Sequence, residues 1–251
     1  MIVKTISVVI PCFNCIQTID KALQSVYDQD YKFIEIVCVD DCSTDNTYEH
    51  IKTNHPFVKL VKNDINLGPA ASRNKGVRFC SGEFVAFLDA DDIWFPNKTN
   101  IQIELMDKYG LDFIGASFTI NTNDNPSTVS QFEIINLYNL AFKNYFPTPS
   151  VIMKRNLVCF NELQRFSEDY DLWLRLAKDK CIMGYVKTPL ISLGKPSYGH
   201  SGLSSNLIKM QLGEISSINK NLKGKWICFF AISWSFIKFI RRLCVVFIRK
   251  L

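Results

Sequence analysis

The chain has 251 residues, of which 47% are hydrophobic and 21% charged, a balance typical of a folded α/β domain and not of disorder. Its formal net charge of +5 belongs to the C-terminal end, because eight basic residues and no acidic one occur from Lys220 onward. A nucleic-acid-binding protein would spread its positive charge over a folded face, so the charge distribution argues against nucleic acid as a partner. The nine scattered cysteines show no zinc-finger spacing and indicate reduced thiols inside a cell.

Strands and helices alternate through the first half of the chain. Apolar β-branched runs and helical spacings predict, in order, strand 6–10, helix 18–27, strand 33–39, a helix ending near His50, strand 58–61, helix 69–79 and strand 83–88. This alternation is typical of a mostly parallel sheet with helices on both faces. In such sheets the ligand binds at the carboxyl ends of the strands.

The second half of the chain is less regular. The predicted elements are helix 96–109, strand 111–118, a polar loop 119–131, helix 132–142, extended segment 150–154, helix 168–178, strand 189–193 and a helix that leads from about 207 into the tail. In the helix 168–178, Asp171 and Arg175 are spaced i, i+4, which predicts a surface ion pair.

Three carboxylates, Asp89, Asp91 and Asp92, follow the strand 83–88. Like charges this close together repel one another and raise one another's pKa, and a bound divalent cation removes the energetic cost of that repulsion. Oxygen ligands suit Mg²⁺ or Mn²⁺. A solvated turn is the alternative explanation of this cluster taken alone, since Asp is common in turns.

A second acidic pair, Asp40 and Asp41, ends the neighbouring strand and therefore converges on the same edge of the sheet. Capping of the next helix accounts for residues 43–45 but not for this pair. A carboxylate here can accept hydrogen bonds from a nucleotide base or ribose.

A third acidic pair, Glu168 and Asp169, begins a predicted helix. The helix macrodipole favours anions in a first turn, which is a purely structural explanation. The functional alternative is a general base that acts on an acceptor hydroxyl.

Five segments, in chain order, together resemble glycosyltransferase family 2 with the GT-A fold: 7–14, 39–47, 66–76, 87–92 and 167–175. The resemblance implies a Rossmann-like α/β domain and an inverting transfer from a nucleotide sugar, usually a UDP-sugar. A metal-dependent nucleotidyltransferase and a non-catalytic nucleotide-sugar-binding protein are the alternatives.

The resemblance also implies roles for individual residues. It identifies Asp89, Ala90 and Asp91 as the DxD element on metal and diphosphate, with Asp91 the direct ligand. It implies a general base at Asp169, with Glu168 beside it. The expected nucleotide-pocket residues are Pro11, Phe13, Asn14, Asp40 and Asp41.

The resemblance also bears on three further positions. Arg73 is expected near the nucleotide or, preferably, as the group that holds the acidic loops in place. His200 is either a metal ligand or an ordinary loop histidine. Cys42 stands where such proteins often carry Gly, and Cys adopts positive φ less readily.

The C-terminal end predicts a basic amphipathic helix. Its apolar run between Lys225 and Lys238 is shorter than the roughly 20 residues that span a bilayer. Lys238, Arg241, Arg242 and Arg249 fall on one helical face, which favours a helix lying in the interface of an anionic membrane. A core-packing or oligomer helix is the alternative.

The expected organisation is a nucleotide-sugar-binding half (1–118), an acceptor-binding half (119–221) and a membrane-interface tail (222–251). A resemblance to bacterial O-antigen transferases implies a lipid-linked polyprenyl-diphosphate saccharide as acceptor. It also implies a peripheral location at the cytoplasmic face of the inner membrane. Glucose or galactose is the expected hexose.

Overall fold

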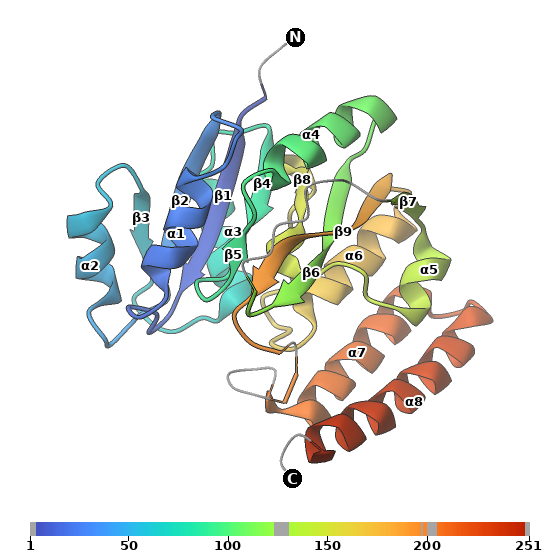
Figure 1. The fold of residues 1–251 in the computed structure, drawn as a ribbon. Coiled ribbons are helices and arrows are strands. Elements are labelled where there is room, and N and C mark those ends of the chain that lie inside the picture. Colours follow the sequence, from blue (N-terminus) through green and yellow to red (C-terminus); the bar gives the residue numbers. More distant parts are fainter. Residues whose placement is uncertain (1–3, 123–130, 197, 200–204, 249–251) are drawn as a thin grey trace.

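The computed structural model describes residues 4–122, 131–196, 198–199 and 205–248 (Figure 1). Within these residues nine strands form one sheet in the order β3-β2-β1-β4-β8-β6-β9-β5, with β7 paired to β9. The elements are β1 Ile6–Cys12, α1 Ile19–Tyr27, β2 Ile34–Asp40, α2 Thr47–Asn54, β3 Lys59–Lys62, α3 Pro69–Arg78, β4 Phe84–Phe87, β5 Ile93–Trp94, α4 Lys98–Tyr109, β6 Phe113–Ile120, β7 Phe132–Ile135, α5 Leu137–Phe142, η1 Thr148–Ser150, β8 Ile152–Lys154, η2 Arg155–Leu157, α6 Glu168–Lys178, β9 Met183–Leu193, α7 Leu207–Leu222 and α8 Ile227–Ile248.

The first four strands form the parallel part of the sheet. β1 pairs with β2 and β4, and β2 pairs with β3, all in parallel. Both faces of β1 are buried, because Val8 and Val9 point to opposite faces and neither is exposed to solvent. Side chains on the two faces belong to two separate apolar clusters, one on each side of the sheet. The predicted α/β architecture is therefore confirmed.

The second half of the sheet contains antiparallel pairs. β8 lies antiparallel between β4 and β6, while β9 runs parallel to β6. The helix predicted over 132–142 is wrong in its first part, because residues 132–135 form β7 and pair with β9. The Asn136 side chain then accepts hydrogen bonds from the backbone N–H groups of Tyr138 and Asn139, and this cap starts α5 only at Leu137. The last strand starts at Met183, earlier than the predicted residue 189.

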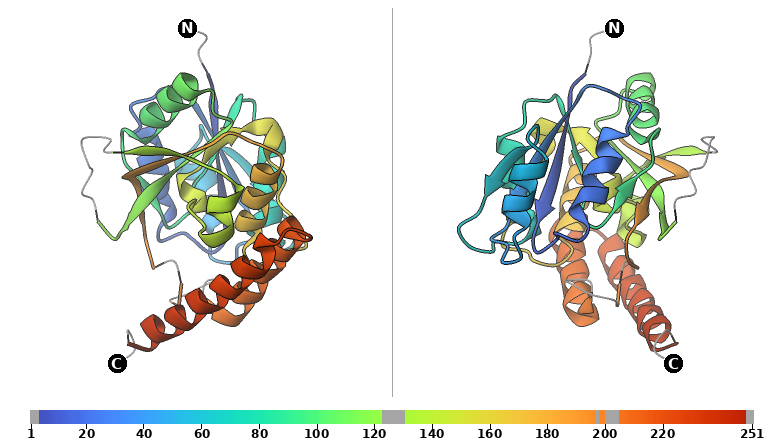
Figure 2. Two further views of the ribbon diagram at one scale, coloured as in Figure 1. Left: turned by 90° about the vertical axis from the view of Figure 1, so that its right-hand side faces the viewer. Right: turned by 60° about the vertical axis from the view of Figure 1, so that its left-hand side comes forward.

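Helix α3 packs very closely on the parallel strands. A Cβ at Gly76 would lie 2.5 Å from Val9 Cγ1, so only glycine permits this approach. α7 and α8 form a helical hairpin at the end of the molecule opposite the N-terminus (Figures 1 and 2). β1 runs from the N-terminus toward that same end, so the carboxyl ends of the parallel strands face the side that carries the hairpin.

Candidate active site

Arg73, on α3, joins two of the three predicted acidic clusters. Its side chain is buried, and its Nη2 donates to Asp89 Oδ1 at 2.8 Å. Its Nη1 donates to Glu168 Oε1 at 3.0 Å. The end of β4 and the start of α6 therefore meet at one guanidinium group, which holds both acidic loops.

The same helix is fixed at its N-terminus by the remaining acidic pair. Asp41 accepts hydrogen bonds from the backbone N–H of Leu67 at 2.9 Å and of Gly68 at 2.8 Å. It also accepts a hydrogen bond from Asn63 Nδ2 at 2.7 Å. Asp40 differs, because its Oδ1 is buried without a hydrogen-bond partner. Asp41 is thus committed to the start of α3, while Asp40 keeps an unused acceptor.

The loops after β1 and β2 are hydrogen-bonded to each other. Asn14 Oδ1 accepts from the Thr44 backbone N–H at 2.8 Å, and the Asn14 N–H donates to Ser43 Oγ at 3.1 Å. Pro11 lies within β1, and Phe13 is half exposed beside Asn14. Cys42 has φ +63°, so this cysteine adopts the left-handed conformation that usually favours glycine.

The DxD segment lies against the segment that follows β9. Asp91 Oδ2 forms an ion pair with Lys195 Nζ at 2.6 Å, and Asp92 Oδ1 accepts from the Gly194 N–H at 2.9 Å. Burial, and then the charge of Asp89, raises the pKa of Asp92 to about 8. A pocket of about 380 Å³ opens here, lined by Thr18, Lys21, Asp91, Asp92, Ile93, Asn121, Gly194 and Lys195.

This donor set fits a hard divalent cation. Burial is the main cause of the raised pKa of Asp92, and the charges of Asp89 and Asp91 add to it, while the charge of Lys195 opposes it. Asp89 pairs with the guanidinium of Arg73, and Asp91 pairs with the ammonium of Lys195, so each carboxylate already faces a cation. Ala90 is buried between the two carboxylates. His200 lies outside the described residues.

The two carboxylates that begin α6 lie in a more enclosed environment. Asp169 Oδ1 accepts from the Tyr170 N–H at 2.7 Å, and Asp169 Oδ2 accepts from the Thr148 hydroxyl at 3.3 Å. Burial raises the pKa of Asp169, and it raises the pKa of Glu168 to about 7 despite the opposing effect of Arg73. A carboxylate whose pKa is raised toward neutrality is suited to proton transfer.

The predicted surface ion pair between Asp171 and Arg175 is wrong. Asp171 is fully buried and binds Asn221 Nδ2 at 3.0 Å and Lys220 Nζ at 3.3 Å, both on α7. Arg175 instead donates to the Cys159 carbonyl. The reason is that α7 covers this face of α6, so a polar stripe that indicated a solvent face lies at a helix–helix contact.

Two residues of this region were not predicted, Thr148 and Lys195. Thr148 begins the short 3-10 helix η1 and Lys195 follows β9, and each contacts a predicted acidic residue that is distant in the sequence. The sequence signal that could have indicated Lys195 is its position after an apolar run. Residues that follow a strand lie at an edge of the sheet, where ligands bind.

Carboxylates clustered at the carboxyl edge of an α/β sheet are typical of enzymes that bind a nucleotide together with a metal ion. Residues 7–166 match the sequence profile of Glycosyl transferase family 2. The chain belongs to this family of glycosyltransferases.

Two *Escherichia coli* proteins are similar to this chain. One is the UDP-Glc:alpha-D-GlcNAc-diphosphoundecaprenol beta-1,3-glucosyltransferase WfgD, 34% identical over 209 residues, which cover 81% of each protein. The other is WfaP, which has the same described activity and is 30% identical over 184 residues, covering 69% of this chain and 70% of WfaP.

Solved structures share the fold at lower identity. *S. aureus* TarS 1-349 in complex with UDP-GlcNAc has a TM-score of 0.70 and 20% identity, covering 95% of this chain and 72% of TarS 1-349. The mannosyltransferase PcManGT from *Pyrobaculum calidifontis*, in complex with GDP-Man and Mn²⁺, has a TM-score of 0.69 and 17% identity, covering 93% and 73%. These likenesses establish a GT-A-like fold.

Proposed function

We propose that the chain transfers glucose from UDP-glucose to the N-acetylglucosamine of a GlcNAc-diphosphoundecaprenol acceptor, with inversion at the anomeric carbon. The donor and acceptor named for WfgD and WfaP support this choice. The observation that carries the proposal is the contact of Arg73 with both Asp89 and Glu168, which brings the DxD segment and the Glu168–Asp169 pair to one site.

In the proposed reaction, Asp169 takes the proton of the acceptor hydroxyl as that oxygen attacks the anomeric carbon. The bond between this carbon and the diphosphate oxygen breaks on the opposite face, so the configuration inverts and UDP leaves. The Thr148 hydroxyl orients Asp169 through its hydrogen bond to Oδ2. Asp40, Asn14, Phe13 and Pro11 line the expected nucleotide pocket.

A divalent ion is part of this proposal. Asp91 would hold Mn²⁺ or Mg²⁺, with Asp89 beside it. When bound, such an ion supplies positive charge where the leaving diphosphate develops negative charge. In the chain itself, Lys195 and Arg73 already provide two cations at the same carboxylates.

The test is release of UDP by the purified protein with a synthetic GlcNAc-diphospho-lipid, comparing UDP-glucose, UDP-galactose and UDP-GlcNAc with and without Mn²⁺. We expect acceptor-dependent release with UDP-glucose that EDTA abolishes. Faster turnover of another donor would contradict the proposed sugar. UDP binding without turnover on any acceptor would favour a non-catalytic nucleotide-sugar-binding protein.

We also propose that the α7–α8 hairpin places the enzyme on an anionic membrane, where a lipid-linked acceptor lies. In the described part of the chain, no helix has the length and apolar character needed to cross a bilayer. One side of α8 packs on α7, because Ile227, Ala231 and Ser235 are buried. The other side of α8 exposes the apolar side chains Phe229, Phe230, Trp234, Phe236, Ile237, Ile240 and Phe247, and Trp226, just before the helix, is exposed as well.

The sequence predicted that the cations of α8 lie together on one face that meets the membrane, but two of them are paired with α7. Lys238 and Arg242 pair with the buried Glu214 of α7 at 2.6 and 2.9 Å, and Arg249 lies outside the described residues. Arg241 and Lys143 instead border an apolar groove of about 980 Å³ that includes Trp226, Phe230 and Trp234. Aromatic side chains beside cations suit the interface of an anionic membrane.

Co-sedimentation with vesicles of anionic lipid tests this part. Trp226→Ser combined with Trp234→Ser keeps the α7 contacts and should release most of the protein from vesicles. Phe57→Ser removes an even more exposed aromatic ring that lies outside the hairpin, and it should leave binding unchanged. Equal sedimentation of all three proteins would contradict the proposed surface.

A further inference from the structure

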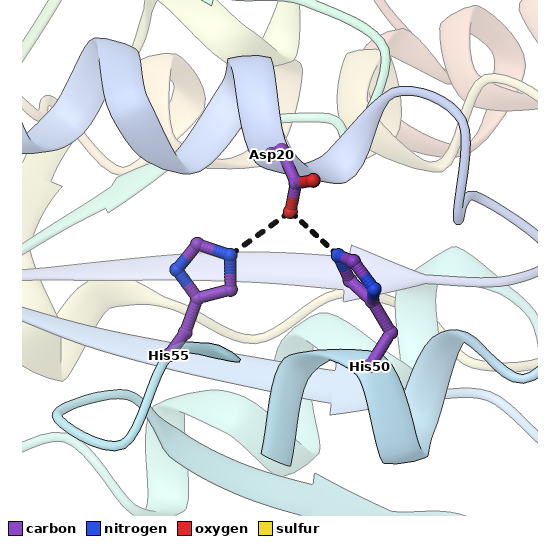
Figure 3. A group of neighbouring side chains, drawn as sticks. All are labelled: Asp20, His50 and His55. Atoms are coloured by element: carbon purple, nitrogen blue, oxygen red, sulfur yellow. Dashed lines mark hydrogen bonds and ion pairs between the residues drawn. The ribbon is translucent and has the colours of Figure 1, made fainter. Parts of the chain in front are cut away.

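We propose that Asp20, His50 and His55 form a second metal site, for a transition-metal ion such as Zn²⁺. Asp20 lies in the first turn of α1, His50 on α2 and His55 directly after α2 (Figure 3). Asp20 Oδ1 lies 2.8 Å from His50 Nε2 and 2.9 Å from His55 Nε2. Two imidazoles and one carboxylate, brought together from two helices, are a common ligand set for Zn²⁺.

The spacing of the three ligand atoms suits one ion. All three atoms lie within 4.8 Å of one another. Bonds of about 2.0–2.2 Å in a tetrahedral site place the ligand atoms roughly 3.3 Å apart. Small side-chain rotations would therefore accommodate the ion between the two rings, and the Asp20 side chain, 56% exposed, leaves one side open for water.

The groups that contact the Nδ1 atoms of the two imidazoles can form hydrogen bonds with them in both the metal-free and the metal-bound state. His55 Nδ1 lies 3.2 Å from the Tyr27 hydroxyl, and His50 Nδ1 lies 3.2 Å from Asn54 Nδ2. In the metal-free state, the Nε2 atom of each ring carries a proton and donates it to Asp20. When a metal ion binds to Nε2, the proton of each ring moves to its Nδ1 atom. Nδ1 of His55 then donates to the Tyr27 oxygen, and Nδ1 of His50 donates to the Asn54 oxygen after an amide flip.

Solvent can reach the three proposed ligands in the folded protein. The side chains of His50 and His55 are 24% and 14% exposed, so solvent reaches the site while the rings stay fixed. Metal entry therefore requires no opening of the fold.

The site differs in chemistry from the DxD segment. Imidazole nitrogen favours Zn²⁺, Co²⁺ or Ni²⁺, whereas the carboxylates around Asp91 favour Mg²⁺ or Mn²⁺. An ion here would tie α1 to α2. These helices follow the two loops that are already joined by the Ile16 N–H to Asp45 Oδ2 bond at 3.2 Å and the Cys15 N–H to Thr47 Oγ1 bond at 3.0 Å. The ion would thus brace the loops that line the expected nucleotide pocket.

The experiment is a titration of Co²⁺ into EDTA-stripped protein without a histidine tag, in excess Mg²⁺, followed by visible absorption. We expect one Co²⁺ per chain with the d–d bands of a nitrogen and oxygen site, and bleaching of these bands by Zn²⁺. Zn²⁺ at a hundredfold excess over its Kd should raise the melting temperature by roughly 5 °C.

His50→Gln and His55→Gln should each weaken Co²⁺ binding by at least ~10-fold, as loss of a ligand requires. Lys52→Gln, an exposed change on the same helix, is the matched control and should bind as the wild type does. The proposal is overturned if the wild type binds no Co²⁺, which leaves a hydrogen-bonded cluster only. It is also overturned if both histidine variants bind normally, or if near-ultraviolet thiolate bands show that cysteines hold the ion.

Discussion

The two acidic clusters on either side of Arg73 contain the same residue types in different surroundings. Asp89 and Asp91 are about one-third exposed, at 34% and 32%, and each faces a basic side chain. Glu168 and Asp169 begin a helix in a more enclosed place, where burial raises the pKa of both carboxylates. On the proposed function, the first cluster binds a divalent cation and the second accepts a proton.

This difference illustrates that the surroundings of a carboxylate, and not its residue type, determine its pKa and the role it can take. Arg73 contacts one residue of each cluster and leaves Asp91 and Asp169 for other partners. The following substitutions test whether the two clusters have separate roles.

The largest effect is expected from Asp169→Asn. Loss of the proton acceptor should reduce kcat by about 10²–10⁴-fold. UDP release in saturating donor and acceptor, with circular dichroism as the control for folding, measures it. Near-native turnover by the folded variant would exclude Asp169 as the base.

Arg73→Met should damage both clusters together. Removing the guanidinium leaves Asp89 and Glu168 without their buried partner, so the free energy of unfolding should fall by about 3–5 kcal/mol. Urea denaturation measures the change. Arg73→Lys keeps the charge but not the two-pronged contact and should lie between the wild type and Arg73→Met. A fully stable Arg73→Met variant would show that the two loops do not depend on this residue.

The pH dependence should show opposite signs for activity and stability. Protonation of Glu168, with its pKa at about 7, weakens its pairing with Arg73, so kcat/KM should fall as the pH drops below about 7. This folded pKa exceeds the ordinary 4.5, so the folded state binds more protons between these values. Stability should therefore decrease as the pH rises through that window. Glu168→Gln should remove this part of the slope in thermal melts, and an unchanged slope would contradict the assignment.

The smallest effect concerns the loop next to Asp41. Cys42→Gly should raise the free energy of unfolding by about 1 kcal/mol, because glycine adopts φ +63° without strain. Asn46, at φ +67°, is the matched control, because Asn tolerates this conformation better than Cys. Asn46→Gly should therefore raise the free energy of unfolding by less than Cys42→Gly does. Chemical denaturation compares them, and an equal or larger gain at Asn46 would refute the strain at Cys42.

Much of the fold and the acidic residues could be predicted from the sequence, because each depends on a local pattern. Asp40 ends one buried parallel strand and Asp89 closely follows another, and this arrangement places both carboxylates at one edge of the sheet. Contacts between segments that are distant in the sequence could not be predicted, including those of Thr148 and Lys195. Asp171 was predicted to face solvent because it is polar. It is covered by α7, and the sequence of α6 does not indicate that contact.

Separate roles for the two clusters are tested most directly by calorimetric titration of UDP with Mn²⁺ into the wild type, Asp91→Asn and Asp169→Asn. We predict that Asp169→Asn binds Mn²⁺ and UDP as tightly as the wild type, while Asp91→Asn loses the metal-dependent part of the affinity. Wild-type binding by Asp91→Asn, or an equal loss in both variants, would contradict the division between a cation-binding and a proton-accepting cluster.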